Sequence, residues 1–201
     1  GSGTYAMESV FRQFVSDGNT VLIIRNGYFS YRWTDIIEQV TNSLGAKSIV
    51  ARAEVKKRDG DQWPRVQPMA IEDVEKLIEK HKPRVVFAPH VETSTGVELP
   101  LEYIKRIGEM TRKASDGIFV LDGIATGTTW IDTKSNLVDA YITAPQKGWS
   151  APACVGVVIL NERGEKAVRG TDSIGSKSDS MALNLRKWLE VSDAYDKGGF
   201  A

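Results

Sequence analysis

The sequence has a single cysteine, Cys154, among 201 residues. One cysteine excludes an internal disulfide. Cys154 lies in the apolar run 153–160, which favours a buried, unreactive thiol in a reducing compartment over a nucleophile or a metal ligand.

The chain also lacks an excess of either charge, because 26 Lys and Arg residues balance 26 Asp and Glu residues. Nucleic acids and anionic membranes usually bind proteins with a basic excess, so neither is expected as a partner. No apolar run approaches the roughly 20 residues that cross a bilayer, and no secretory leader is visible. We therefore expect a soluble, cytoplasmic protein that buries one sizeable core.

The sequence does contain an alternation of helices and short apolar strands. The predicted strands cover residues 21–24, 48–51, 84–88, 117–121, 139–143 and 154–160. Helical spacing of apolar residues predicts helices over 4–15, 33–44, 71–80, 100–113 and 181–194, and a turn is expected at 161–164. Because the strands are apolar along their whole length, the pattern predicts an α/β three-layer sandwich with a mainly parallel sheet.

Ligands bind beyond the carboxyl ends of the strands in such sheets, and Asp122 directly follows one strand. An unpaired charge buried there is costly, so Asp122 needs a cationic partner. A turn or N-cap role is equally open, because Gly123 is the next residue. A cofactor with a protonated ring nitrogen, such as pyridoxal phosphate, would supply the partner.

Lys147 follows the strand 139–143 in a segment rich in glycine, tryptophan and proline. Two interpretations are open. Lysines are mostly exposed, so Lys147 could be an ordinary loop residue. Alternatively, its amine forms an imine with the aldehyde of the same cofactor.

Three further segments suit a bound cofactor. Residues Gly1–Thr4 precede a helix, where free N–H groups and a hydroxyl suit a phosphate monoester, although such a start is also typical of an expression scar. The loop 90–96 either is simply polar or places an imidazole and hydroxyls around a ring. Phe29 either packs in the core or lies against a planar cofactor.

Five motifs occur together in one order along nearly the whole chain: Gly1–Thr4 with Met7 and Glu8, Asn26–Phe29, His90–Val97, Leu121–Asp122, and Gln146–Lys147 with Pro152. In this order the set resembles the class V aminotransferases of pyridoxal-phosphate fold type I, in particular the alanine–glyoxylate and serine–pyruvate aminotransferases. Each motif is unspecific alone, whereas the ordered set is specific.

The resemblance implies that pyridoxal 5'-phosphate is the cofactor and that Lys147 holds it as a Schiff base. Lys147 is also implied to shuttle the proton between the substrate's α carbon and C4′ of the cofactor. Asp122 is implied to keep the ring nitrogen protonated, so that the ring accepts the electrons released when the α proton leaves.

The resemblance also implies the remaining cofactor contacts. Phosphate contacts are implied for Ser2, Gly3, Thr4 and Gln146, and the match of Gly3 and Thr4 argues against an expression scar. A hydroxyl contact to the ring's phenolic oxygen is implied for Thr93, and an apolar contact on one ring face for Ile124. Phe29 stands where relatives often place a stacking tryptophan on the other face.

Members of the family are longer than this chain and form homodimers. An N-terminal arm precedes the glycine loop, and a C-terminal small domain carries the arginine that binds the substrate carboxylate. The neighbouring subunit adds phosphate contacts. Residues 1–201 are therefore interpreted as the cofactor-binding large domain alone, in which no residue is assigned to carboxylate recognition.

The resemblance implies transfer of an amino group from a small amino acid, alanine or serine, to glyoxylate or another 2-oxo acid. One alternative is a domain that binds the cofactor without turnover. Another is a lyase or desulfurase reaction on the same fold. Against a desulfurase, Cys154 is expected inside a strand, and no second cysteine exists to carry a persulfide.

Overall fold

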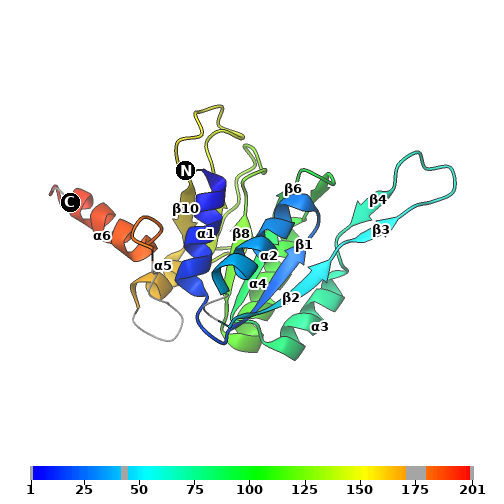
Figure 1. Ribbon diagram of the computed structural model, residues 1–201, viewed down its shortest axis with the longest axis horizontal. Coiled ribbons are helices and arrows are strands. Elements are labelled where there is room, and N and C mark those ends of the chain that lie inside the picture. The colour runs from blue at the N-terminus through cyan, green and yellow to red at the C-terminus, as the bar shows by residue number, and fades with distance from the viewer. Residues whose placement is uncertain (1, 42–44, 171–179, 200–201) are drawn as a thin grey trace.

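The computed structural model describes residues 2–41, 45–170 and 180–199 (Figure 1). Its helices are α1 (Gly3–Phe14), α2 (Tyr28–Thr41), α3 (Ile71–His81), α4 (Leu101–Ser115), α5 (Glu162–Arg169) and α6 (Leu185–Asp196). Its strands are β1 (Thr20–Arg25), β2 (Lys47–Arg52), β3 (Glu54–Lys56), β4 (Arg65–Gln67), β5 (Val85–Pro89), β6 (Val91–Glu92), β7 (Val97–Glu98), β8 (Ile118–Asp122), β9 (Ala140–Thr143) and β10 (Val157–Leu160). Gly1 of the expected glycine loop lies outside the described residues. None of the described helices has both the length and the apolar character to span a bilayer.

The central sheet has the strand order β10, β9, β8, β5, β1, β2. All neighbouring pairs are parallel except β10 and β9, which are antiparallel at one edge. The mainly parallel α/β sandwich expected from the sequence is therefore confirmed. Because the parallel strands run in one direction, the segments that follow them meet along one edge of the sheet.

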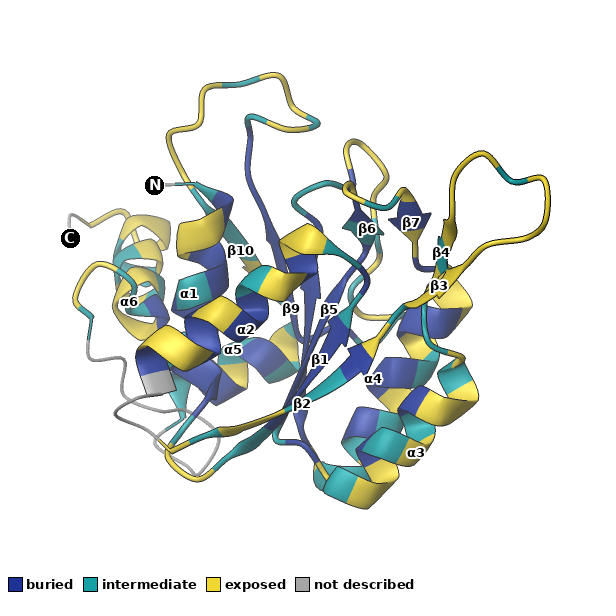
Figure 2. Ribbon diagram, turned by 45° about the vertical axis from the view of Figure 1, so that its right-hand side comes forward, coloured by how far each residue is buried: buried dark blue, intermediate teal, exposed yellow. Residues whose placement is uncertain are grey.

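Helices cover both faces of the sheet, and the buried strands lie between them (Figure 2). Successive side chains of a strand point to opposite faces. In β1, Val21 and Ile23 pack into the core formed with α1 and α2, whereas Leu22 and Ile24 pack into the core formed with α3 and α4. Burial on both faces explains why the strands read as continuous apolar runs.

The structure corrects two expectations at the antiparallel edge. The expected strand 154–160 is shorter, since β10 begins at Val157, and Cys154 lies before it and is exposed. An apolar run at a sheet edge does not require burial, which is why the expected buried thiol was wrong. The expected turn at 161–164 is the first turn of α5, because the Asn161 side chain accepts a hydrogen bond from the Gly164 N–H at 2.8 Å and caps the helix.

Other differences fall at the ends of elements and in loops. The last helix begins at Leu185 rather than at residue 181, because the Asn184 side chain accepts a hydrogen bond from the Lys187 N–H at 3.2 Å. The loops that follow β2 and β5 contain the short hairpins β3–β4 and β6–β7. Both hairpins escaped prediction because their strands are only two or three residues long.

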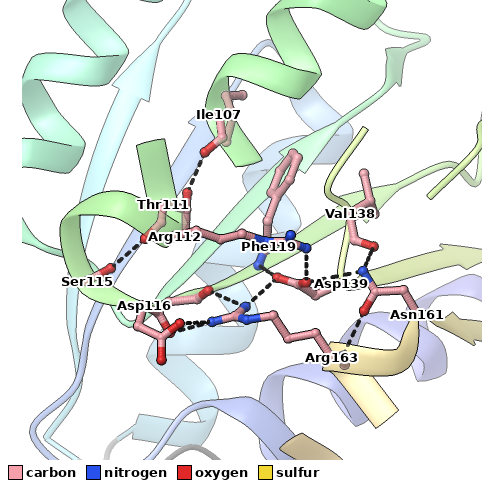
Figure 3. Close-up of polar contacts among 12 residues, drawn as sticks. Ile107, Thr111, Arg112, Ser115, Asp116, Phe119, Val138, Asp139, Asn161 and Arg163 are labelled. Carbon is pink, nitrogen blue, oxygen red and sulfur yellow. Dashed lines mark hydrogen bonds and ion pairs between the residues drawn. The ribbon is translucent and has the colours of Figure 1, made fainter. Parts of the chain in front are cut away.

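A buried carboxylate joins β9 to its neighbours (Figure 3). Asp139, directly before β9, is 0% exposed and accepts hydrogen bonds from Arg112 of α4 at 2.8 Å, Arg163 of α5 at 2.8 Å and the Phe119 N–H of β8 at 2.9 Å. These contacts compensate its charge and fix where β9 enters the sheet. The direction of β9 in turn decides where the segment around Lys147 emerges.

Candidate active site

The segments that follow β1, β5, β8 and β9 form a narrow cleft at the carboxyl edge of the sheet. It is lined by Met7, Phe29, Arg32, Pro89, Val91, Thr93, Asp122, Ile124, Ala125 and Lys147. The structure thus brings together five residues expected from the sequence: Phe29, Thr93, Asp122, Ile124 and Lys147. The free space between the side chains is about 30 Å³, which is room for one water molecule.

The other expected site residues lie just outside this lining. Gly3 begins α1 against Ile124, and a Cβ at Gly3 would lie 2.5 Å from Ile124 Cδ1, so a larger residue at this position would have to displace the Ile124 side chain. Thr4 accepts a hydrogen bond at Oγ1 from Arg32 Nη1 at 3.1 Å. Ser2 precedes α1 and makes no side-chain cap. Gln146 Oε1 is buried and has no hydrogen-bond partner in the described part of the chain.

Asp122 ends β8 at the floor of the cleft and is 8% exposed. Its carboxylate accepts a hydrogen bond from the Ile124 N–H at 3.0 Å, and no described cationic group lies within ion-pair distance. Burial, and next the negative charge of Glu92, raise the pKa of Asp122 to about 6, against the opposing effects of the Ile124 N–H and the positive charge of Arg32. The carboxylate therefore favours a cation that enters the cleft.

Lys147 lies four residues after the end of β9 in an exposed turn. It lines the same cleft as Asp122. The neighbouring Gly148 packs against Gly127, and a Cβ at Gly148 would lie 2.3 Å from the Gly127 carbonyl carbon. This close approach fixes the Lys147 turn against the loop that follows Asp122. An amine and a buried carboxylate are thus held in one cleft by two adjacent strands.

Glu92 was not identified as a site residue from the sequence, although it lies in the loop 90–96 that was considered. Its carboxylate is 0% exposed and accepts hydrogen bonds from the Ser30 N–H at 2.8 Å, Ser30 Oγ at 2.7 Å, Ser94 Oγ at 2.6 Å and the Phe29 N–H at 3.2 Å. Burial alone would raise the pKa of Glu92, but these hydrogen bonds outweigh it and lower the pKa. Glu92 therefore fixes the first turn of α2, where a negative charge also favours the helix dipole.

Arg32 is a second residue that the sequence reasoning missed. It follows Phe29 by three residues on α2, so both side chains lie on one face of the helix. Its guanidinium carbon lies 5.8 Å from the centre of the Phe29 ring, within cation–π distance. Phe29 itself is 38% exposed, so its ring is partly open to solvent.

His90, considered as an imidazole near the ring, is buried away from the cleft lining. Its Nδ1 lies 2.9 Å from Thr126 Oγ1. Burial lowers its pKa, with a smaller opposing effect from Glu98, so the ring is neutral near pH 7. The structure supports a role for His90 in holding the loop that follows Asp122.

A larger cavity lies elsewhere in the molecule. It has a volume of about 590 Å³ and is lined in part by Arg112, Arg163 and Lys134. Both arginines are already paired with the buried Asp139, which gives them a structural role. The smaller cleft, with its uncompensated buried carboxylate, is the better candidate for chemistry.

Relatives of known activity resemble this chain along most of its length. It is 30% identical to the serine–glyoxylate aminotransferase of Methylorubrum extorquens over 99% of this chain and 46% of that protein. It is 31% identical to the (S)-ureidoglycine–glyoxylate transaminase of Bacillus subtilis over 92% of this chain and 41% of that protein. The chain thus spans about half the length of these curated relatives.

Solved structures agree in fold. The ureidoglycine–glyoxylate aminotransferase from Bacillus subtilis superimposes with a TM-score of 0.74 and 28% identity, covering 94% of this chain and 44% of that chain. The alanine–glyoxylate aminotransferase from Nostoc sp. gives a TM-score of 0.72 and 25% identity, covering 94% and 45%. The family model for Aminotransferase class-V matches residues 5–199. Since that match takes in almost the whole chain, the protein belongs to the class V aminotransferases, a family that depends on pyridoxal phosphate.

Proposed function

We propose that this chain is the cofactor-binding large domain of an aminotransferase that moves an amino group from alanine or serine to glyoxylate or another 2-oxo acid. The observation that carries the proposal is the placement of two groups in one cleft: the Lys147 amine and the buried Asp122 carboxylate, which has no cationic partner among the described residues. The names of the relatives, which include a serine–glyoxylate and a rat alanine–glyoxylate aminotransferase, support the choice of substrates.

The residues of the cleft fit pyridoxal phosphate in their chemistry. Asp122 lacks a cationic partner among the described residues, and a protonated ring nitrogen would provide one. The aromatic Phe29 and the apolar Ile124 suit the faces of a planar ring. The free space of about 30 Å³ is smaller than such a ring, so side chains of the lining must move when a ring enters.

Each residue then has a defined task in the proposed reaction. When bound, the cofactor supplies an electron sink for the electron pair released at the substrate's α carbon. Asp122 holds the proton on the ring nitrogen. Lys147 would hold the cofactor through its amine, and Nζ, once free, moves the proton that leaves the α carbon. Thr93 would donate a hydrogen bond to the phenolic oxygen.

The phosphate end of the cofactor is assigned to the start of α1. Ser2, Gly3 and Thr4 provide N–H groups and hydroxyls at the positive end of the helix dipole. Gln146, whose side chain has a buried atom without a described partner, is the further phosphate contact in this proposal.

A homodimer is proposed on the resemblance to the class V aminotransferases, and sedimentation analysis of the purified chain would test it. A cytoplasmic location is proposed on the single, unpaired Cys154, which suits a reducing compartment. Fractionation of the source cells would test that location.

Two alternatives use the same fold. A domain that binds the cofactor without turnover is one, since the chain spans about half of its relatives. A desulfurase is the other, and a cysteine desulfurase is among the structures of similar fold. Because Cys154 is exposed, burial in a strand no longer speaks against a desulfurase. Cys154 instead lines a groove with Tyr5 and Trp188, and this groove shares no lining residue with the cleft, which still disfavours a desulfurase.

An absorption experiment tests the proposal. Adding pyridoxal phosphate to the chain is expected to produce a visible band that Lys147→Ala abolishes. Lys134→Ala is the control, because Lys134 is also an exposed loop lysine but lies outside the cleft. Absence of the band from the unmodified chain would refute the cofactor proposal. Loss of the band on adding alanine or serine, with release of a 2-oxo acid, distinguishes an active enzyme from an inert domain.

A further inference from the structure

Arg32 contributes a cationic side chain to the lining of the cleft. Its Nη1 donates to a neutral acceptor, Thr4 Oγ1, at 3.1 Å. No carboxylate among the described residues lies within ion-pair distance of its guanidinium. An arginine carries five N–H donors, so most of them remain available to a ligand.

The charges of the cleft favour an anion beside Arg32. Two lining residues, Arg32 and Lys147, carry positive charge, and Asp122 is the one acidic residue of the lining. Asp122 lies on the floor of the cleft, whereas Arg32 reaches toward the first turn of α1. A planar guanidinium with free donors is the side chain that best matches a phosphate or carboxylate group.

The position of Arg32 is fixed from two sides. The first turn of α2 is held by the buried carboxylate of Glu92, which accepts hydrogen bonds from Phe29 and Ser30. At the far end of the Arg32 side chain, the guanidinium donates a hydrogen bond to Thr4 in the first turn of α1. That turn contains no acidic residue, so nothing there opposes an anion.

We propose that Arg32 binds the phosphate monoester of the cofactor together with the Thr4 hydroxyl that it contacts. This inference rests on the proposed function and adds to it a phosphate ligand that is distant in sequence from Gly3 and Thr4. Phosphate is favoured over a substrate carboxylate because Arg32 is directed to the start of α1, where the helix dipole also favours a dianion.

The test compares two ligands that differ only in the phosphate group. Dissociation constants for pyridoxal phosphate and for pyridoxal are measured by absorption titration of the unmodified chain, Arg32→Gln and Arg32→Lys. Arg32→Gln is expected to weaken pyridoxal phosphate binding by about tenfold or more and to leave pyridoxal within about twofold, since a charge-assisted hydrogen bond is lost for one ligand alone. Arg32→Lys keeps the positive charge but loses the planar set of guanidinium N–H donors, so its dissociation constant for pyridoxal phosphate is expected to be intermediate.

Two controls accompany the titration. Arg25→Gln is the matched control, because Arg25 also contacts α2, through Thr34 and the Tyr31 ring, but does not line the cleft; it is expected to change neither dissociation constant. Inorganic phosphate is the second probe. It is expected to compete with pyridoxal phosphate for the unmodified chain and to compete less well for Arg32→Gln.

The outcomes separate this inference from the proposed function. If the unmodified chain binds neither compound, the proposed function fails and the inference fails with it. A second outcome is that the unmodified chain binds both compounds and the two Arg32 substitutions weaken the binding of both equally or of neither. In that case the assignment of Arg32 to the phosphate is wrong while the proposed function stands. If only the spectral response of the loaded chain to alanine is impaired, Arg32 binds a substrate carboxylate instead, which also overturns the inference.

Discussion

Asp122 shows how the environment of one residue prepares it for a ligand. The side chain is 8% exposed and one backbone N–H donates to it, so ionisation inside the fold is unfavourable until a cation arrives. The nearby charges act in opposite directions, because Glu92 raises the pKa of Asp122 and Arg32 lowers it. A cation beside this carboxylate would favour its ionised form and lower its pKa.

The first residue-scale prediction concerns stability and pH. The pKa of Asp122 rises from an ordinary value of 3.8 to about 6 on folding, so the folded chain without cofactor loses stability as pH rises from about 4 through 6. With about 1.4 kcal/mol for each pKa unit, ionisation costs roughly 3 kcal/mol. Asp122→Asn avoids this cost. The free energy of unfolding of Asp122→Asn minus that of the unmodified chain is therefore expected to be roughly 2–3 kcal/mol larger well above pH 6 than at pH 4.

Urea unfolding of both proteins at each pH measures this difference. Asp196→Asn is the control, because Asp196 is exposed. If the difference between Asp122→Asn and the unmodified chain does not vary with pH, Asp122 does not titrate as described.

The second residue-scale prediction concerns Glu92 as a positioning residue. Glu92 accepts five hydrogen bonds from Phe29, Ser30 and Ser94. Glu92→Gln replaces one of the two acceptor oxygens by an NH2 donor, so the start of α2 is held less firmly and we expect weaker cofactor binding. The change also removes the negative charge that raises the pKa of Asp122, so the pH midpoint of cofactor binding is expected to move down from about 6.

Titration with pyridoxal phosphate on both sides of this pH measures both effects. Glu92→Asp separates them, because it keeps the charge but shortens the reach of the carboxylate. It is expected to weaken binding with little change in the midpoint. A purely structural role for Glu92 predicts the same midpoint in all three proteins.

At the scale of elements, β9 depends on a polar anchor as well as on apolar packing. Asp139 at its start is held by side chains of α4 and α5 and by the backbone of β8. The anchor joins three elements that are distant in sequence, and the segment at the other end of β9 leads to Lys147. Loss of the Asp139 contacts would therefore displace β9 and, with it, the segment that carries Lys147.

The element-scale prediction follows from this anchor. Asp139→Asn leaves Arg112 and Arg163 without their shared charge partner, so we expect a loss of about 3–5 kcal/mol in the free energy of unfolding. Urea unfolding measures the loss. The control is Glu72→Gln, which breaks an exposed ion pair with Arg106 between α3 and α4 and is expected to have a smaller effect. Equal effects of the two substitutions would contradict the anchor role.

At the scale of the whole molecule, the parallel order of the strands gathers the site. Asp122 ends β8 and Lys147 follows the adjacent strand β9, while Phe29 and Arg32 come from α2 after β1. Residues separated by more than a hundred positions in sequence thus share one cleft of about 30 Å³. The turn of the hairpin β6–β7 contributes Thr93 to the lining, and Val91 and Glu92 of β6 support the cleft.

Much of this arrangement could be predicted from the sequence. The central strands were found because each is a continuous apolar run, and Phe29, Thr93, Asp122, Ile124 and Lys147 were expected at their carboxyl ends. The prediction failed where local pattern and burial disagree. Cys154 lies in an apolar run at a sheet edge that solvent reaches, and the polar residues 161–164 start a capped helix.

Apolar periodicity and the ordered motifs are local properties of the chain, so the amino-acid order alone predicts the sandwich, the positions of most strands and the family. The contact of Glu92 with the start of α2 and that of Arg32 with Thr4 are visible only in the folded chain. Those contacts join side chains 28 to 62 residues apart, and side chains so distant meet only when the parallel sheet brings the carboxyl ends of its strands to one edge.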